Sequence, residues 1–223
     1  MKQTQQTPLV CTFLFLLCFS AHAQTAHPED GKVIDGVYYN SFFSFAFRYP
    51  KDWAVHDEEI NERIRKRAKE EAVKSGVPQV EAYLLFTASR HPRGTPGIAL
   101  NPTILIIAEN IAPVPRNYTA KNYLLEVRPI KLKEGAQPLL KEPVEFRVAG
   151  FKFFRDDYRA EIKGVQTRQA IFVYVTKGYA VAFSFAGEDQ KSLDEMAKAM
   201  ETLLPVGEGS GIGPGRTLER QPN

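Results

Sequence analysis

Four consecutive residues, His56-Asp57-Glu58-Glu59, bring together an imidazole and three carboxylates, which are groups that bind metal ions and exchange protons. The run directly precedes a segment with helical periodicity, and acidic residues in a first helical turn are favoured by the helix dipole. Adjacent residues of a helix also point in different directions, which opposes shared coordination of one ion. We therefore interpret the run as a helix start and keep His56 and Asp57 only as weak metal-ligand candidates.

A second acidic cluster lies in a segment with the composition of a strand. Asp157 and Glu161 are four residues apart, so on a strand both face the same side, a geometry open to acid–base catalysis or calcium binding. Arg155 and Arg159 fall on that side too. The favoured interpretation is a solvated ladder of alternating charge, with Asp157 and Glu161 kept as weak metal-ligand candidates.

The first 23 residues have the pattern of a secretory signal peptide. Leu9–Phe19 is apolar, and Ala21–Ala23 places small residues two positions apart, which predicts cleavage before Gln24. The apolar run is about half the length of a membrane-spanning helix. We expect an exported protein, periplasmic or extracellular, that does not span a membrane. A lipid anchor on Cys18 is the competing interpretation, although lipoprotein signals place a small residue where this chain has Leu17.

Nucleophiles are scarce once this segment is removed. Cys11 and Cys18 both lie within it, so the mature chain has no thiol for catalysis or metal binding. A serine–histidine–acid triad would have to use His56 or His91, and the chain has no Gly-x-Ser-x-Gly. The glycine-rich tail is not a phosphate loop, because no strand precedes it and no helix follows. We expect no catalytic site and no cofactor.

The charges of the mature chain nearly balance, with 28 Lys and Arg residues (29 less Lys2) against 26 Asp and Glu residues. This excess is too small for a nucleic-acid-binding face, so we expect no nucleic-acid partner. About 200 residues remain after cleavage, enough for one domain with a hydrophobic core. We expect a flexible N-terminus over 24–32, one monomeric domain over 33–205 and a disordered glycine-rich tail over 206–223.

The first elements of this domain are two strands and a helix. Every second residue from Phe43 to Tyr49 is aromatic, which places four rings on one face of a strand. A strand over 37–39 is its predicted antiparallel partner. Residues 58–75 have apolar side chains at every fourth position and acid–base pairs at helical spacing, and this pattern predicts a helix.

Two further strands are predicted over 80–89 and 103–109. A proline- and glycine-rich loop at 91–102 joins them. Loops carry binding residues more often than the elements that they connect. His91 and Arg93, in this loop, are therefore candidates for a partner surface.

Three x-Gly pairs, with glycines spaced by fourteen residues, predict a four-strand antiparallel meander. Each glycine supplies the positive φ that a two-residue hairpin needs. The pairs are at 149–150, 163–164 and 177–178, and the strands are expected at 140–148, 151–161, 166–176 and 179–186.

Two more helices complete the pattern. Thr119 is the predicted N-cap of one, which we expect to end near Arg128, because the helical conformation is disfavoured before Pro129. The other closes the domain, with Ser192-x-x-Glu195 as its predicted capping box, and ends before Pro205.

The last strand of the meander, 179–186, alternates large side chains with alanine and serine. Its small-residue face would let a helix lie close, so we expect the closing helix there. The apolar stripe of that helix includes Leu193, Met196, Met200 and Leu204.

Three motifs, in this order, resemble the PsbP-like superfamily, which contains the extrinsic subunit P of photosystem II. The first is Tyr39-Asn40 with the segment Phe45–Trp53 (FAFRYPKDW), and the second is the turn Val148-Ala149-Gly150 before a long hairpin. The third is Gly178-Tyr179 leading to Phe183-Ser184-Phe185 before the closing helix. The resemblance covers roughly 36–204, which is most of the mature chain.

The resemblance implies an α+β fold. An antiparallel β-sheet is covered by helices in an α-β-α sandwich, with a C-terminal four-strand meander and a closing helix. Members of the family are mostly small, non-catalytic domains that bind or stabilise a partner. This chain departs from the family in the long charged helix at 58–75 and in the loop at 90–102, which has the character of an insertion.

The leading hypothesis is thus an exported, non-enzymatic domain that binds a protein or assembly in the cell envelope. One alternative is a carrier of a small ligand or lipid, because a sheet covered by helices can hold an apolar pocket between its layers. A hydrolase that depends on carboxylates or a bound metal is the other alternative.

Overall fold

A computed structural model describes residues 27–75, 81–114, 117–162 and 164–207. The predicted signal peptide, with the alternative of a lipid on Cys18, lies outside the described residues, as does the tail from 208 to 223. Within the described residues, no helix is long and apolar enough to cross a membrane.

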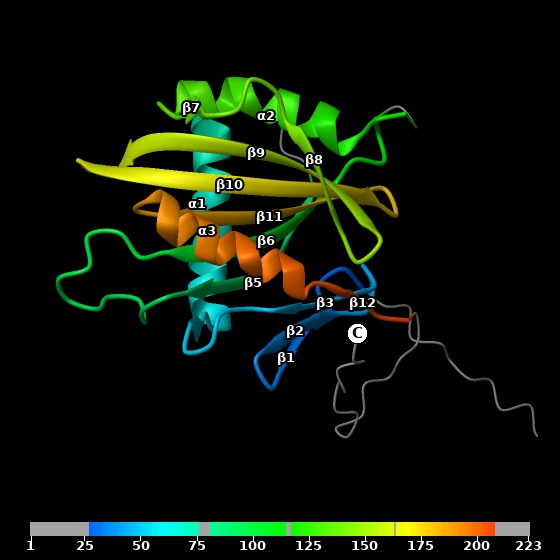
Figure 1. Cartoon of the computed structure of the whole chain (residues 1–223), viewed down its shortest axis with the longest axis horizontal. Coiled ribbons are helices and arrows are strands. Elements are labelled where there is room, and N and C mark those ends of the chain that lie inside the picture. Colours follow the sequence, from blue (N-terminus) through cyan, green and yellow to red (C-terminus); the bar gives the residue numbers. More distant parts are fainter. Residues whose placement is uncertain (1–26, 76–80, 115–116, 163, 208–223) are drawn as a thin grey trace, which may run out of the picture.

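An antiparallel sheet of eight strands occupies the centre of the domain (Figure 1). In spatial order its strands are β4 (Ala54–Val55), β5 (Ala82–Ser89), β6 (Thr103–Asn110), β11 (Tyr179–Gly187), β10 (Val165–Thr176), β9 (Phe151–Ile162) and β7 (Gln137–Pro138), and β8 (Val144–Val148) pairs with β9 beside β7. We call it the main sheet.

The predicted meander is confirmed as β8 to β11. Ala149 and Gly150 have φ values of 47° and 84°, and Lys177 and Gly178 have φ values of 50° and 79°. Two consecutive residues of positive φ make the type I′ turn, whose twist matches that of the flanking strands. Gly164 also has a positive φ of 79°, while Lys163 lies outside the described residues.

A second, smaller antiparallel sheet lies against the main sheet. Its strands, in spatial order, are β1 (Lys32–Ile34), β2 (Val37–Asn40), β3 (Phe45–Arg48) and β12 (Leu204–Pro205). The predicted pairing of two N-terminal strands is confirmed, with Tyr38 opposite Phe47. Pairing of β12 with β3 brings the end of the described chain back to this small sheet.

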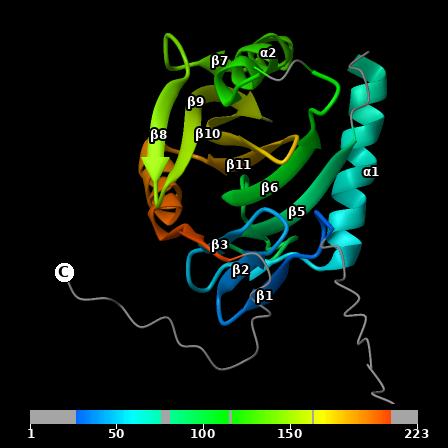
Figure 2. The same ribbon diagram turned by 90° about the vertical axis from the view of Figure 1, so that its right-hand side faces the viewer.

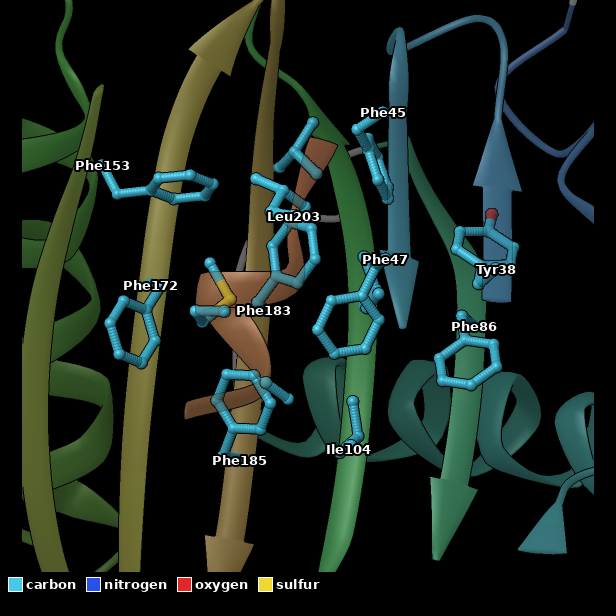
Figure 3. Packing of buried hydrophobic residues seen from close by; sticks show 14 of the residues in the cluster. Tyr38, Phe45, Phe47, Phe86, Ile104, Phe153, Phe172, Phe183, Phe185 and Leu203 are labelled. Atoms are coloured by element: carbon cyan, nitrogen blue, oxygen red, sulfur yellow. The ribbon is translucent and has the colours of Figure 1, made fainter. Parts of the chain in front are cut away.

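Aromatic rings from both sheets form the larger core (Figure 3). Phe45 and Phe47 of the small sheet are fully buried, and their ring centroids lie 5.3 and 5.6 Å from that of Phe183 in the main sheet. The period-two aromatic pattern of the sequence thus places rings between the sheets, where core packing accounts for them.

Helix α2 (Ala120–Lys133) covers the opposite face of the main sheet. Its Leu124 packs in one cluster with Ala180 and Ala182 of β11. The expectation that the closing helix lies on this small-residue face is therefore wrong. That helix, α3 (Gln190–Lys198), packs on the aromatic face instead, together with the following 3₁₀ helix η1 (Ala199–Thr202). Their long side chains Leu193, Met196 and Met200 fill the space between the rings.

The predicted end of α2 is also wrong, because the helix continues through Pro129 to Lys133. Proline removes one backbone donor and disfavours a helical conformation before it. The last turn is nevertheless held, since the amide of Glu134 donates to the carbonyl of Ile130 and Gly135 adopts a φ of 84°. The predicted N-cap is confirmed: the Thr119 hydroxyl accepts from the amide of Asn122, in a reciprocal capping box.

The predicted capping box of α3 is wrong by three residues. Asp189 is the N-cap, and its carboxylate accepts a hydrogen bond of 2.7 Å from the amide of Ser192. Leu204, expected in the apolar stripe, is 41% exposed in β12, and the neighbouring Leu203 is the buried residue.

Helix α1 (Glu58–Ser75) has the predicted limits. Figure 2 shows it beside β5 and β6, on the side of the main sheet opposite α3. The layers are thus α1 and α2, the main sheet, and α3 with the small sheet, which is the expected α+β sandwich.

Candidate functional site

His56 lies between β4 and α1 and bonds to β5 in two ways. Its amide donates to the carbonyl of Thr87 at 3.1 Å, and its Nε2 lies 2.9 Å from Oγ of Ser89. The Ser89 hydroxyl in turn donates to the carbonyl of His91 at 2.8 Å. Since that hydroxyl has one proton, Nε2 of His56 must be the donor to Ser89.

This arrangement fixes the chemistry of the imidazole. Nδ1 is the unprotonated nitrogen, and it is buried with no hydrogen-bond partner among the described residues. Burial, with the positive charge of Arg93, lowers the pKa of His56 below its ordinary value, against the opposing effect of Asp57. A neutral ring already protonated at Nε2 cannot take a proton from Ser89, so the pair lacks the arrangement of a nucleophile and its base.

Asp57, the other candidate ligand of this cluster, caps α1. Its Oδ1 accepts from the amide of Ile60 at 2.9 Å, and its carbonyl accepts from the amide of Asn61 at 3.0 Å. The acidic run therefore folds as a helix start, as the sequence indicated. Across the residues that the structure describes, no three histidine, cysteine or acidic side chains are placed to hold a metal ion.

Asp157 and Glu161 are not brought together. Asp157 is only 8% exposed and accepts two hydrogen bonds from Arg155, at 2.7 and 2.8 Å. Glu161 is exposed and accepts from Gln166 at 3.0 Å. The interpretation of a solvated charge ladder is wrong for Asp157, because its pair with Arg155 is largely buried.

The most deeply buried carboxylate, Asp156, was not a sequence candidate. It has no exposed surface, and it accepts two hydrogen bonds from Arg128 of α2, at 2.7 and 2.8 Å, and one of 2.7 Å from the Tyr158 hydroxyl. Arg128 also donates to the carbonyls of Leu140 and Lys141. The two bonds to Asp156 attach α2 to β9. They also raise the pKa of Arg128 above its ordinary value.

One sequence signal could have found Asp156. It follows Phe154 and precedes Tyr158 at a spacing of two, so it falls on the apolar side of its strand. A carboxylate on such a face requires a buried partner, and this one is supplied by a helix that ends more than twenty residues earlier.

The loop with His91 and Arg93 is closed at its base. The Asn101 side chain accepts from the amide of His91 at 3.0 Å and donates to its carbonyl at 2.6 Å. Arg93 is exposed and His91 is half-buried. The base of this loop lies beside His56, because Ser89 is bonded both to the His56 ring and to the carbonyl of His91. The positive charge of Arg93 is also close enough to lower the pKa of His56.

A cleft of about 380 Å³ opens next to this corner. It runs along the outer edge of β5, where Leu84 and Leu85 line it. Asn61 and Arg65 of α1 lie on one side, and Val33 of β1 with the preceding Gly31 lies on the other. We call it the β5-edge cleft. His56 and Thr87 lie at its end, and the Thr87 hydroxyl donates to Asn61 at 2.7 Å.

A second cleft of about 300 Å³ lies at the C-terminal end of α2, and we call it the α2 cleft. Ala136, Ala160 and Ala186 contribute apolar surface, and Leu100 brings in the 91–102 loop. Glu161, one of the sequence candidates, also lines it.

Comparison with known proteins assigns the chain to no family. No family model matches it, and no curated protein matches it. Among solved structures it is similar to LpqN of Mycobacterium tuberculosis, described as involved in cell envelope biogenesis, with 12% identity, a TM-score of 0.42, and 73% of this chain and 83% of that one covered.

Two other solved structures are similar at the same level. A protein of unknown function from Pseudomonas aeruginosa, PA94, described as a putative regulator, has 12% identity, a TM-score of 0.39 and coverage of 58% of this chain and 86% of that one. A Bacteroides thetaiotaomicron protein has 13% identity and a TM-score of 0.35; the match covers 74% of this chain but 46% of that one. Structural similarity at this level does not indicate a function for this chain.

Proposed function

We propose that this chain is an exported, non-enzymatic domain that binds a partner protein in the cell envelope. One observation carries the proposal: the side chains best suited to catalysis are engaged within the fold. Asp156 and Asp157 are each held by an arginine, and His56 donates to Ser89. The sequence resemblance to the PsbP-like superfamily, most of whose members bind or stabilise a partner, supports the same function.

In-cell photo-crosslinking of the full chain tests this proposal. A photoreactive amino acid replaces one exposed residue at a time on separate surfaces: Val33, Val73, Leu132 or Ile162. We expect at least one position to give a single reproducible adduct with an envelope protein, identified by mass spectrometry. Absence of any discrete adduct from all four positions would contradict partner binding.

A carrier of a small apolar ligand is the second candidate, and the α2 cleft favours it. Its volume of about 300 Å³ is at the lower limit of ordinary small-molecule sites, which are mostly apolar with a few polar groups. Native mass spectrometry of the freshly purified protein distinguishes the two functions. A bound small molecule that is lost on Ala160→Phe supports the carrier, whereas a mass equal to that of the unliganded chain argues against it.

A further inference from the structure

The two sides of strand β5 are covered unequally. On one side β6 pairs with it along its whole length, from Ala82 opposite Glu109 to Ser89 opposite Thr103. On the other side β4 pairs only with Ala88 and Ser89, and the amide of His56 adds one bond to Thr87. Among the described residues, no strand lies beside positions 82–86 on that side.

The register shows which backbone groups face this open side. The amide of Asn110 donates to the carbonyl of Glu81, so in an antiparallel ladder the backbone groups of residues 81 and 83 face β6. The N–H and C=O groups of Ala82 and Leu84 therefore point outward, toward the β5-edge cleft. Such unpaired groups on an edge strand are a template for another strand.

A β-bulge lies within the same stretch. The register shifts between Leu84 and Phe86, so Leu85 is an extra residue, and all three residues line the cleft. Bulges bend an edge strand and change the direction of its side chains, often next to a binding site. Here the bulge places the half-buried Leu84 and Leu85 beside the outward backbone groups.

The walls of the cleft select the kind of partner. Helix α1 lies on one side, and on the other lies β1, which is itself the terminal strand of the small sheet. A second copy of this chain has the same walls beside its own β5, and they would prevent the two edges from meeting. A single extended segment can lie lengthwise in the cleft, because residues 82–86 span about 17 Å at strand spacing.

The charges favour a basic occupant. Glu29, Glu58 and Arg65 are the acidic and basic residues that line the cleft, which leaves one net negative charge. Arg65 is already bonded to Glu58. The flanking Val33 and Val55 are about 40% exposed and supply apolar contacts.

We propose that the β5-edge cleft binds an extended segment of the partner, with alternating apolar and basic side chains, which adds to the main sheet as a strand next to β5. Backbone hydrogen bonds to Ala82 and Leu84 would provide the affinity, and the valines and Glu29 the preference for side chains. The inference rests on the proposed function and names the contact through which it acts.

A phage-displayed library of random octapeptides, panned against the folded domain, provides the probe. We expect the selected peptides to alternate apolar with Lys or Arg residues. Synthetic copies should protect the amides of Ala82 and Leu84 from hydrogen exchange. Failure to select any peptide, or selected peptides that leave both amides unprotected, would overturn strand addition.

Two variants with matched controls test the contact. Leu84→Pro removes an outward amide. Val33→Arg cancels the single net negative charge of the cleft and replaces an apolar contact with a cation. Each variant should weaken peptide binding at least about tenfold. Val144→Pro and Val144→Arg, in the edge strand β8 at the opposite end of the main sheet, should leave binding unchanged. Circular dichroism and the melting temperature establish that each variant is folded. If Leu84→Pro does not fold, Val33→Arg still decides the test, because Val33 is exposed and its replacement does not disturb the core.

The outcomes separate this inference from the proposed function. An envelope adduct from Val73, Leu132 or Ile162 but not from Val33, with peptide binding unaffected by both cleft variants, would refute the strand contact and leave partner binding intact. Peptide binding at β5 without any adduct in cells would refute the envelope partner and leave the cleft as a peptide site.

Discussion

The two ends of the main sheet are finished in opposite ways. At one end, β7 and β8 both pair with the outer side of β9, and the carboxylates of Asp156 and Asp157 are bonded to arginines. At the other end, β4 covers two residues of β5 and a cleft begins where it stops. Strand β9 is therefore paired on both of its sides, whereas β5 has no strand beside residues 82–86 on its outer side among the described residues. Unpaired backbone groups of that kind can accept another strand, so we infer that the β9 end contributes stability and the β5 end recognition.

The largest expected effect is at the closed end. Asp156→Ala leaves the guanidinium of Arg128, whose side chain is 14% exposed, without its carboxylate partner, and should reduce the free energy of unfolding by about 3–5 kcal/mol. Urea denaturation measures this loss. Glu161→Ala, at an exposed position on the same strand, is the control and should change stability by less than about 0.5 kcal/mol. Similar values for both variants would show that the buried pair does not hold this end.

The next effect concerns the wall of the β5-edge cleft. A Cβ added at Gly31 would lie 2.0 Å from the hydroxyl oxygen of Tyr38, whose side chain is buried in the core. Gly31→Ala should therefore lower stability by about 1–3 kcal/mol through overpacking. In Gly207→Ala, where an added Cβ meets nothing within 4 Å, the melting temperature should stay close to that of the parent. If Gly31→Ala has the same stability as the parent, the backbone at this wall can shift to make room for the added Cβ.

Helix caps at the two ends give a smaller and more direct comparison. Thr119→Ala removes the capping box of α2, which packs in a core cluster, and should cost about 1 kcal/mol of global stability. Asp57→Ala removes the cap of α1, which has mostly exposed side chains. We expect faster hydrogen exchange in α1 and a global loss less than about half as large. Equal global losses would show that α1 unfolds together with the rest of the domain.

The smallest effect is a dependence on pH at His56. Its pKa is lower in the folded state, so the unfolded chain binds more protons as the pH falls below about 6.5, the ordinary histidine value. The stabilisation from neutral His56 is therefore complete above that pH and is lost as the pH falls toward the folded-state pKa. In His56→Gln, the melting temperature should decline less between pH 7.5 and 5. Parallel pH profiles for the two proteins would exclude this contribution.

Local patterns predicted most of the fold. The x-Gly turns at 149–150 and 177–178 and the limits of α1 follow from interactions between residues close in sequence, and both are confirmed. The alternation of aromatics on one strand is confirmed for Phe45 and Phe47, whereas Phe43 precedes β3 and Tyr49 follows it. The errors at Pro129 and Ser192 arose where a local preference competed with another interaction. The penalty at Pro129 is offset by packing and end bonds of α2, and Asp189 is available as a cap just before Ser192.

The candidate site was much less predictable. Its position depends on where β4 stops and on how the small sheet meets β5, which brings Val33 beside Leu84 across some fifty residues of chain. No periodicity encodes such a contact. The sequence did single out His56 and the 91–102 loop. His56 lies at the end of the β5-edge cleft, and the base of the loop lies next to His56. His56 nevertheless has no catalytic arrangement.

The single tryptophan of the chain, Trp53, packs against the larger core just before β4, with the guanidinium carbon of Arg90 6.0 Å from its ring centroid. Arg90 begins the loop that contains His91, and it also pairs with Glu195 of α3. Indole emission is sensitive to nearby charge and to solvent. The protein therefore contains its own fluorophore where three separate segments meet, and a change in the packing of that corner can be followed in the light it emits, without any attached dye.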